Sequence, residues 1–163
     1  MQIKTTFLQL EEKEHLKQML FDYFNEIDAS KIIETTNKRT LDYPYLNSYW
    51  TDKGRFPLKI EFDNKMVGFA LINNWVINKE FNADHSIAEF YIKPTYRKKG
   101  IGKEVAYHLF HKFAGKWEIR QSSKNHIAVL FWRNIISEYT NGNYKETEHK
   151  TNDVIELIQL FES

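Results

Sequence analysis

The stretch AEFYIKPTYRKKGIG, residues 88–102, runs directly into KEVAYHLFHKF, residues 103–113, and decides the fold of this chain. An apolar run, Phe90–Ile92, ends just before Pro94, and a basic turn with two glycines, Gly100 and Gly102, follows it. From Ile101 onwards, apolar residues recur at spacings of three and four, which is the period of a helix with one buried face. The pattern predicts a strand, a cationic loop and a helix.

A loop of this kind places positive charge where a helix begins. The first N–H groups of a helix have no partner within it, and its dipole is positive at that end, so the site attracts anions and phosphate above all. Glycines remove side chains where a backbone has to close around a ligand. The loop over 97–102 therefore predicts a diphosphate-binding site.

Length and composition predict one ordered globular domain over residues 1–163. The chain is 42% hydrophobic and 15% aromatic, with only six Gly and three Pro. Its net charge of +1 speaks against a general nucleic-acid binder, and the absence of cysteine excludes disulfides, thiolate metal sites and a cysteine nucleophile. There is no signal-type leader and no apolar run of about 20 residues, so we expect a cytoplasmic protein without membrane contact.

The periodicity predicts the remaining elements in turn. Strands are expected at 2–10, 57–62, 66–77, 86–93, 117–121, 143–148 and 153–161, and helices at 11–27, 99–114 and 124–138. In the last of these helices the expected apolar side is made by Ile127, Leu130, Phe131 and Ile135. The strand–helix–strand unit over 86–121 should be parallel and its neighbours antiparallel. The predicted fold class is α/β (α+β), a mixed, mostly antiparallel twisted sheet of about seven strands with helices on both faces.

The loop matches neither of the common phosphate-binding fingerprints. No third glycine completes G-x-G-x-x-G, and no GK[ST] occurs. Arg97-x-x-Gly100-x-Gly102 after an apolar strand instead resembles the cofactor motif of the GNAT N-acetyltransferases. Asn125-x-x-Ala128-x-x-Phe131-Trp132 is similar to a second signature of that superfamily, and the element order agrees over nearly the whole chain.

The resemblance implies acetyl-CoA as co-substrate, with no metal. Backbone groups of Phe90, Tyr91 and Ile92 would pair with the pantetheine arm, and Asn125 and Phe131 would contact the arm as well. The diphosphate would be held by N–H groups of the loop and by nearby lysines, namely Arg97, Lys98, Lys99, Gly100, Ile101, Gly102 and Lys103.

In this chemistry an amine attacks the thioester directly, so the site needs a base, an oxyanion donor and an acid for the thiolate. Glu89 is the candidate base because it is a carboxylate in an apolar strand, although it could equally face solvent or pair with a lysine. Many relatives have a tyrosine acid where this chain has Trp132, whose indole N–H is no useful proton donor. The candidate acids are then Tyr139 or Tyr91, or the thiolate leaves unassisted.

The acceptor is expected to be a small-molecule amine (a polyamine, an amino sugar or an amino-acid-like compound). Tyr43, Tyr45, Tyr49 and Trp50, beside Asp42, suit a small cationic amine, although the same aromatic cluster could simply be packed. Three alternatives stay open: a protein or peptide N-acetyltransferase, a non-catalytic acyl-CoA-binding regulatory module, and a nucleic-acid-binding domain that uses Arg97–Lys99. A homodimer is also possible.

Overall fold

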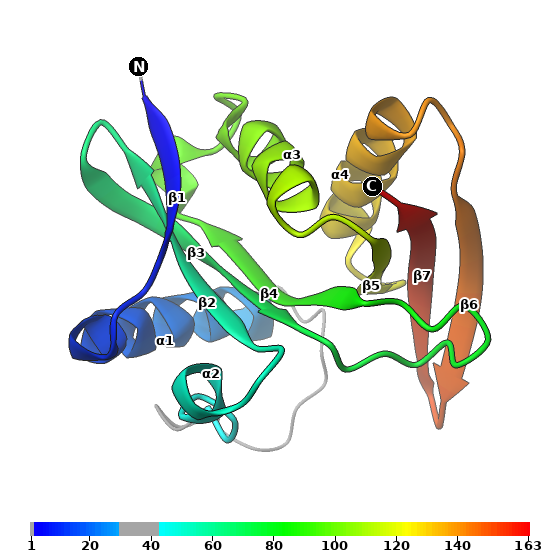
Figure 1. Cartoon of the computed structure of the whole chain (residues 1–163), viewed down its shortest axis with the longest axis horizontal. Helices are drawn as coiled ribbons and strands as arrows, with labels where there is room; N and C mark the ends of the chain where they lie inside the picture. The colour runs from blue at the N-terminus through cyan, green and yellow to red at the C-terminus, as the bar shows by residue number, and fades with distance from the viewer. Residues whose placement is uncertain (1, 30–42) are drawn as a thin grey trace. The chain divides into compact units, whose positions relative to one another are not determined.

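The structure, a computed structural model, describes residues 2–29 and 43–163 (Figure 1). Asp42 lies outside the described residues. The elements in chain order are β1 Ile3–Phe7, a 3₁₀ turn Leu10–Glu12, α1 Lys13–Ala29, α2 Ser48–Thr51, β2 Phe56–Phe62, β3 Lys65–Asn73, β4 His85–Ile92, a 3₁₀ turn Pro94–Tyr96, α3 Ile101–Lys112, β5 Lys116–Ser122, α4 His126–Tyr139, β6 Lys145–Thr151 and β7 Val154–Glu162.

The strands form one seven-stranded sheet in the order β1-β2-β3-β4-β5-β7-β6. The β4–β5 ladder is parallel and pairs His85 with Trp117 and Ser86 with Glu118. The ladders β1–β2, β2–β3, β5–β7 and β6–β7 are antiparallel. The predicted fold class, a mixed sheet of about seven strands with one parallel strand–helix–strand unit, is confirmed.

The chain divides into two compact units. The first consists of Met1–Ile72 and Ala88–Gly102, and the second of Asn73–Ile87 and Lys103–Ser163. β4 and α3 each contribute residues to both units.

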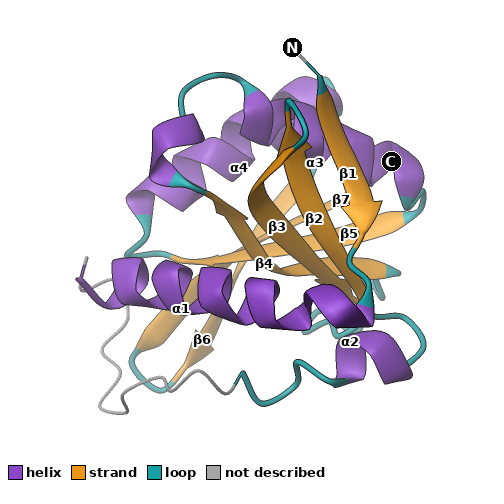
Figure 2. Ribbon diagram, turned by 90° about the vertical axis from the view of Figure 1, so that its left-hand side faces the viewer, coloured by secondary structure: helices purple, strands orange, loops and turns teal. Residues whose placement is uncertain are grey.

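In the first unit, α1 lies across β2 and β3 (Figure 2). Four of its apolar residues at spacings of three and four are buried, together with side chains from β3 and β4, in one cluster: Leu16, Met19, Leu20 and Phe24 with Phe69, Leu71 and Tyr91. The helix therefore buries the face that the sequence pattern predicts.

In the second unit, aromatic side chains of α3, β5 and β7 form the core. The ring of Phe110 lies 5.3 Å from that of Trp117 and 4.9 Å from that of Phe161. The predicted apolar side of α4 is wrong in part, because Ile127 and Leu130 are 83% and 59% exposed. The buried residues are Val129, Trp132, Ile135 and Ile136, and at 100° per residue this stripe lies opposite Ile127 and Leu130.

A buried carboxylate in β5 fixes the connection between β3 and β4. Glu118 has no exposed surface, and its two oxygens accept the N–H groups of Ile77 and Asn78 at 2.8 and 2.9 Å. Arg120 lies 3.4 Å from the same carboxylate and stacks on Trp75, 4.5 Å from the ring centre. This region of the second unit is thus ordered by hydrogen bonds to an ionised group, which are stronger than those between neutral groups.

Candidate functional site

The predicted diphosphate loop lies in the first unit, between the end of β4 and the start of α3. Lys98 and Gly100 have positive φ, 59° and 78°, and no atom lies within 4 Å of where a Cβ on Gly100 would stand. The loop leads directly into α3, whose first residue is Ile101. Because the first turn of a helix leaves its N–H groups without helical partners, this junction is suited to an anion.

Arg97 contacts the protein through both its main chain and its side chain. Its N–H donates to the Pro94 carbonyl at 3.2 Å, and its guanidinium donates to Ile92 O at 2.8 Å and to both carboxylate oxygens of Glu26 at 2.5 and 2.9 Å. The Glu26 carboxylate raises the pKa of Arg97 further. Since these partners join α1 to the end of β4, Arg97 fixes the base of the loop, and its own N–H and guanidinium are already hydrogen-bonded within the protein.

The predicted lysines differ in what surrounds them. Lys98 and Lys99 are exposed, and the Lys99 ammonium lies over the Tyr96 ring, 5.3 Å from its centre. In the second unit, Lys103 forms an ion pair with Glu138, which raises the pKa of Lys103. Lys98 and Lys99 are therefore the side chains of the first unit that put positive charge on the loop.

The strand residues before the loop pack tightly within the first unit. Phe90 is half-buried, and Tyr91 and Ile92 are buried. A Cβ added to Gly68 in β3 would come within 2.1 Å of the Tyr91 carbonyl oxygen. Because Gly68 has no side chain, the backbone of β3 approaches that of β4 closely at Tyr91, one of the residues predicted to bind the pantetheine arm.

Glu89, the candidate base, is half-buried and accepts a hydrogen bond from the Tyr43 hydroxyl, 3.3 Å from its Oε1. Burial first, and the Glu89 charge second, raise the pKa of Tyr43 well above its usual range. The hydroxyl thus keeps its proton and remains a donor. The ring of Tyr43 stacks on Phe24, with centroids 6.0 Å apart, so the predicted aromatic cluster is packed at this residue.

Two predicted site residues lie near the start of α4, in the second unit. Asn125 is the N-cap of the helix, and its Oδ1 accepts the Ala128 N–H at 3.0 Å. Phe131 packs its ring edge-on against Trp132 at 4.9 Å. The Asn125 side-chain NH₂ takes no part in the cap, so a cap role and a ligand role are compatible.

Tyr139 lies at the other end of α4. Its hydroxyl is 3.3 Å from His111 Nδ1, its ring packs against Phe110 at 5.0 Å, and burial raises its pKa. At 1.5 Å per residue, the 14 positions from Asn125 to Tyr139 span roughly 21 Å. The acid role of Tyr139 stays a prediction.

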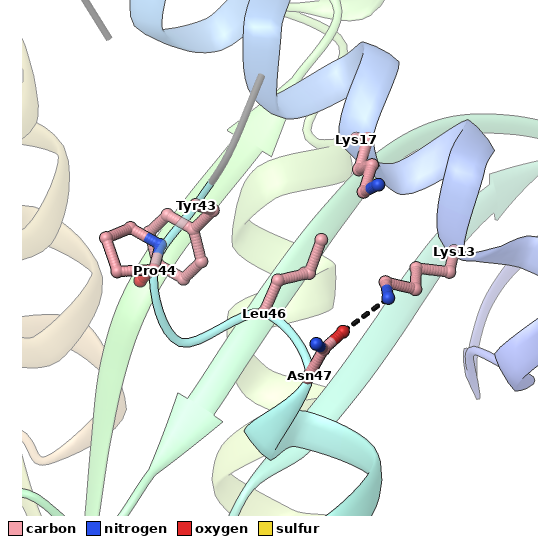
Figure 3. A pocket seen from close by; sticks show the side chains of 6 residues that line it. All are labelled: Lys13, Lys17, Tyr43, Pro44, Leu46 and Asn47. Carbon is pink, nitrogen blue, oxygen red and sulfur yellow. Dashed lines mark hydrogen bonds between the residues drawn. The ribbon is translucent and has the colours of Figure 1, made fainter. Parts of the chain in front are cut away.

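Sequence reasoning missed three features. The Tyr43–Glu89 pair joins residues 46 positions apart, and no local pattern reports such a pair. In the sequence, Glu118 lies between two apolar residues of β5. A solvent-facing residue of a strand shows the same alternation, so the pattern does not indicate that Glu118 is buried. A small pocket beside Tyr43 is lined by Lys13 and Lys17, which the pattern of α1 places on its polar side (Figure 3).

Within residues 2–29 and 43–163, no group of three or more His, Asp or Glu side chains has an arrangement that could hold a metal. No helix of the described part of the chain is long and apolar enough to span a membrane.

Comparison with known proteins gives one family. Residues 16–135 match the model of the acetyltransferase (GNAT) family. No curated protein shows significant similarity to the chain.

Solved structures resemble the whole chain at low sequence identity. The PaiA N-acetyltransferase of Thermoplasma acidophilum, in complex with coenzyme A, is 18% identical with a TM-score of 0.69, and 100% of each chain is covered. YncA of Salmonella typhimurium, a putative acetyltransferase with its cofactor acetyl-CoA, is 14% identical (TM-score 0.65, 98% and 93% covered). The ribosomal-protein-S18-alanine N-acetyltransferase of Escherichia coli is 11% identical (TM-score 0.61, 99% and 94% covered).

Proposed function

Because the chain belongs to the acetyltransferase (GNAT) family, we propose that it moves the acetyl group of acetyl-CoA directly to a primary amine of a small molecule. The observation that carries the proposal is the junction of β4 and α3, where a loop with positive φ at Lys98 and Gly100 leads into a helix N-terminus. The family match confirms the predicted family and the predicted enzyme class, an acyltransferase.

We propose that the diphosphate binds to N–H groups of 98–102, with charge from Lys98 and Lys99, and that Arg97 holds this loop in place. Backbone groups of Phe90–Ile92 would pair with the pantetheine arm, and Asn125 and Phe131 would contact it. The ligands named for two structural neighbours, coenzyme A and acetyl-CoA, support this choice of co-substrate.

The transfer forms a C–N bond and breaks the thioester C–S bond. Glu89, held by Tyr43, would take a proton from the acceptor's ammonium and leave a nucleophilic amine. An N–H of Phe90–Ile92 would donate to the oxygen that becomes negative. As the amide forms, the nitrogen would lose its second proton to water, and the departing thiolate would be protonated by Tyr139, Tyr91 or water. No covalent intermediate on the protein is needed, which agrees with the absence of cysteine.

Turnover of acetyl-CoA over a panel of amines, followed as free thiol, tests the proposal. Acetylation of small amines supports it. Turnover with N-terminal peptides alone would indicate a protein acceptor. Binding of acetyl-CoA with no turnover on any amine would indicate a non-catalytic acyl-CoA-binding module. A single domain over 1–163, a cytoplasmic location and a homodimer stay predictions.

Replacing Glu89 with Gln should lower turnover by roughly 10²–10⁴-fold, the usual contribution of a general base. The amide keeps the shape and can still accept the Tyr43 hydroxyl, so the dissociation constant of acetyl-CoA should stay the same. Steady-state rates and calorimetric binding measure the two quantities, with Glu61→Gln on β2 as the control. Rates equal to those of the unmodified protein throughout its active pH range would remove Glu89 from the mechanism.

Asn125 can be tested separately as cap and as ligand. Asn125→Ser keeps a good N-cap and should leave the free energy of unfolding almost unchanged, whereas Asn125→Ala should lower it by about 1 kcal/mol. Both remove the side-chain NH₂, so both should weaken acetyl-CoA binding by about tenfold, the value of one hydrogen bond. Urea unfolding and calorimetry provide the comparison. If Asn125→Ser binds acetyl-CoA normally, Asn125 is a cap and nothing more.

A further inference from the structure

A small cavity of about 100 Å³ opens in the first unit beside Tyr43, whose hydroxyl donates to the candidate base (Figure 3). Six residues from the first turns of α1 and from the segment before α2 line it: Lys13, Lys17, Tyr43, Pro44, Leu46 and Asn47. Among the described residues of the lining, Lys13 and Lys17 carry a positive charge and none carries a negative charge, which favours an anion.

The two ammonium groups differ in how they are held. Lys13 donates to the Asn47 side-chain oxygen, which is a neutral partner. Lys17 lies 3.0 Å from a carboxylate oxygen of Glu14, whose side chain is 79% exposed. An exposed ion pair of this kind contributes about 0–1 kcal/mol, so an anion in the cavity can readily take the place of Glu14.

The cavity has room for an acidic group. About 100 Å³ of space holds several water molecules, since about 10–15 Å³ of such space is enough for one. A carboxylate or a phosphate group therefore fits.

Tyr43 connects this cavity to Glu89. Its ring is one wall of the cavity, while its hydroxyl donates to Glu89 Oε1 at 3.3 Å. The candidate base and the two lysines therefore lie within the reach of one tyrosine side chain. An acceptor that reaches from Glu89 to this cavity would meet the two lysines, which suit an acidic group at its other end.

We infer that the acceptor amine carries an anionic group, a carboxylate or a phosphate, which Lys13 and Lys17 bind while Glu89 receives the amine. The inference rests on the proposed function and narrows it, since the two lysines favour an amino-acid-like acceptor over a polyamine. A second ammonium placed about 4 Å from a lysine near the protein surface would meet a repulsion of about 4 kcal/mol.

The test compares straight-chain ω-amino acids, from glycine to 6-aminohexanoate, with their primary amides. Each pair keeps the amine and the chain length and differs only in the negative charge. We expect at least one acid to have a kcat/KM about tenfold or more above that of its amide, through a lower KM. The variant Lys17→Met should bring that ratio close to one, and Lys65→Met, which removes an exposed lysine on β3, should leave it unchanged.

The outcomes separate failure of this inference from failure of the proposed function. Three outcomes would each overturn the inference and leave the proposed acetyltransferase activity intact. The amides could be acetylated at the same kcat/KM as the acids, the preference for the acids could persist in Lys17→Met, or turnover could be confined to amines without an acidic group. Absence of turnover with every amine contradicts the proposed function and, with it, this inference.

Discussion

The substitution Gly100→Glu should weaken acetyl-CoA binding by roughly 100-fold or more while the chain remains folded. No atom lies within 4 Å of the position where its Cβ would stand, so the new side chain has room. Its carboxylate would lie close to the predicted diphosphate, and two like charges about 5 Å apart near a protein surface repel by about 3 kcal/mol. Calorimetric titration with acetyl-CoA measures the change.

The chain offers a matched control in the turn after α4. Gly142 has φ of 80° against 78° for Gly100, and a Cβ there also meets nothing within 4 Å. Gly142→Glu therefore carries the same backbone strain, about 1 kcal/mol, and the same added charge. If the two variants bind acetyl-CoA equally well, the loop over 98–102 does not hold the diphosphate.

The sequence predicts those helices, strands and turns whose pattern is contained in one continuous segment. The run from Phe90 through Pro94 and Gly100 into α3 contains a strand, a stop, a turn and a helix start in consecutive residues, and the structure has each of them. The residues that bury α1 recur at helical spacing in the same way. Local periodicity and turn chemistry are sufficient for such elements.

Features that depend on tertiary partners could not be predicted. The sequence places Arg97 at the start of the predicted anion-binding loop, but it does not report that the guanidinium is held by Glu26, 71 positions away. On α4, apolar residues lie on more than one side, so periodicity alone could not exclude Ile127 and Leu130 from the buried stripe. The hydrogen bond from Tyr43 to Glu89 could not be predicted either, because it forms only once the chain has folded.

Replacing Glu118 with Ala should lower the free energy of unfolding by roughly 3–5 kcal/mol. This is the largest loss of stability that we expect from replacing one polar residue of this chain. The substitution leaves the N–H groups of Ile77 and Asn78 without their acceptors in a buried place and deprives Arg120 of its carboxylate. For a chain of 163 residues this corresponds to a fall in Tm of roughly 10 °C, measurable by circular dichroism.

The variant Glu118→Gln shows whether charge or shape is responsible for this stability. Its volume is nearly the same, but its amide has one acceptor oxygen for two N–H groups, and its NH₂ would face the second of them. We therefore expect about half of the Ala effect, whereas Glu148→Gln, at an exposed site on β6, should change Tm very little. Stability of Glu118→Gln equal to that of the unmodified protein would mean that packing, and not the ionised carboxylate, orders the connection between β3 and β4.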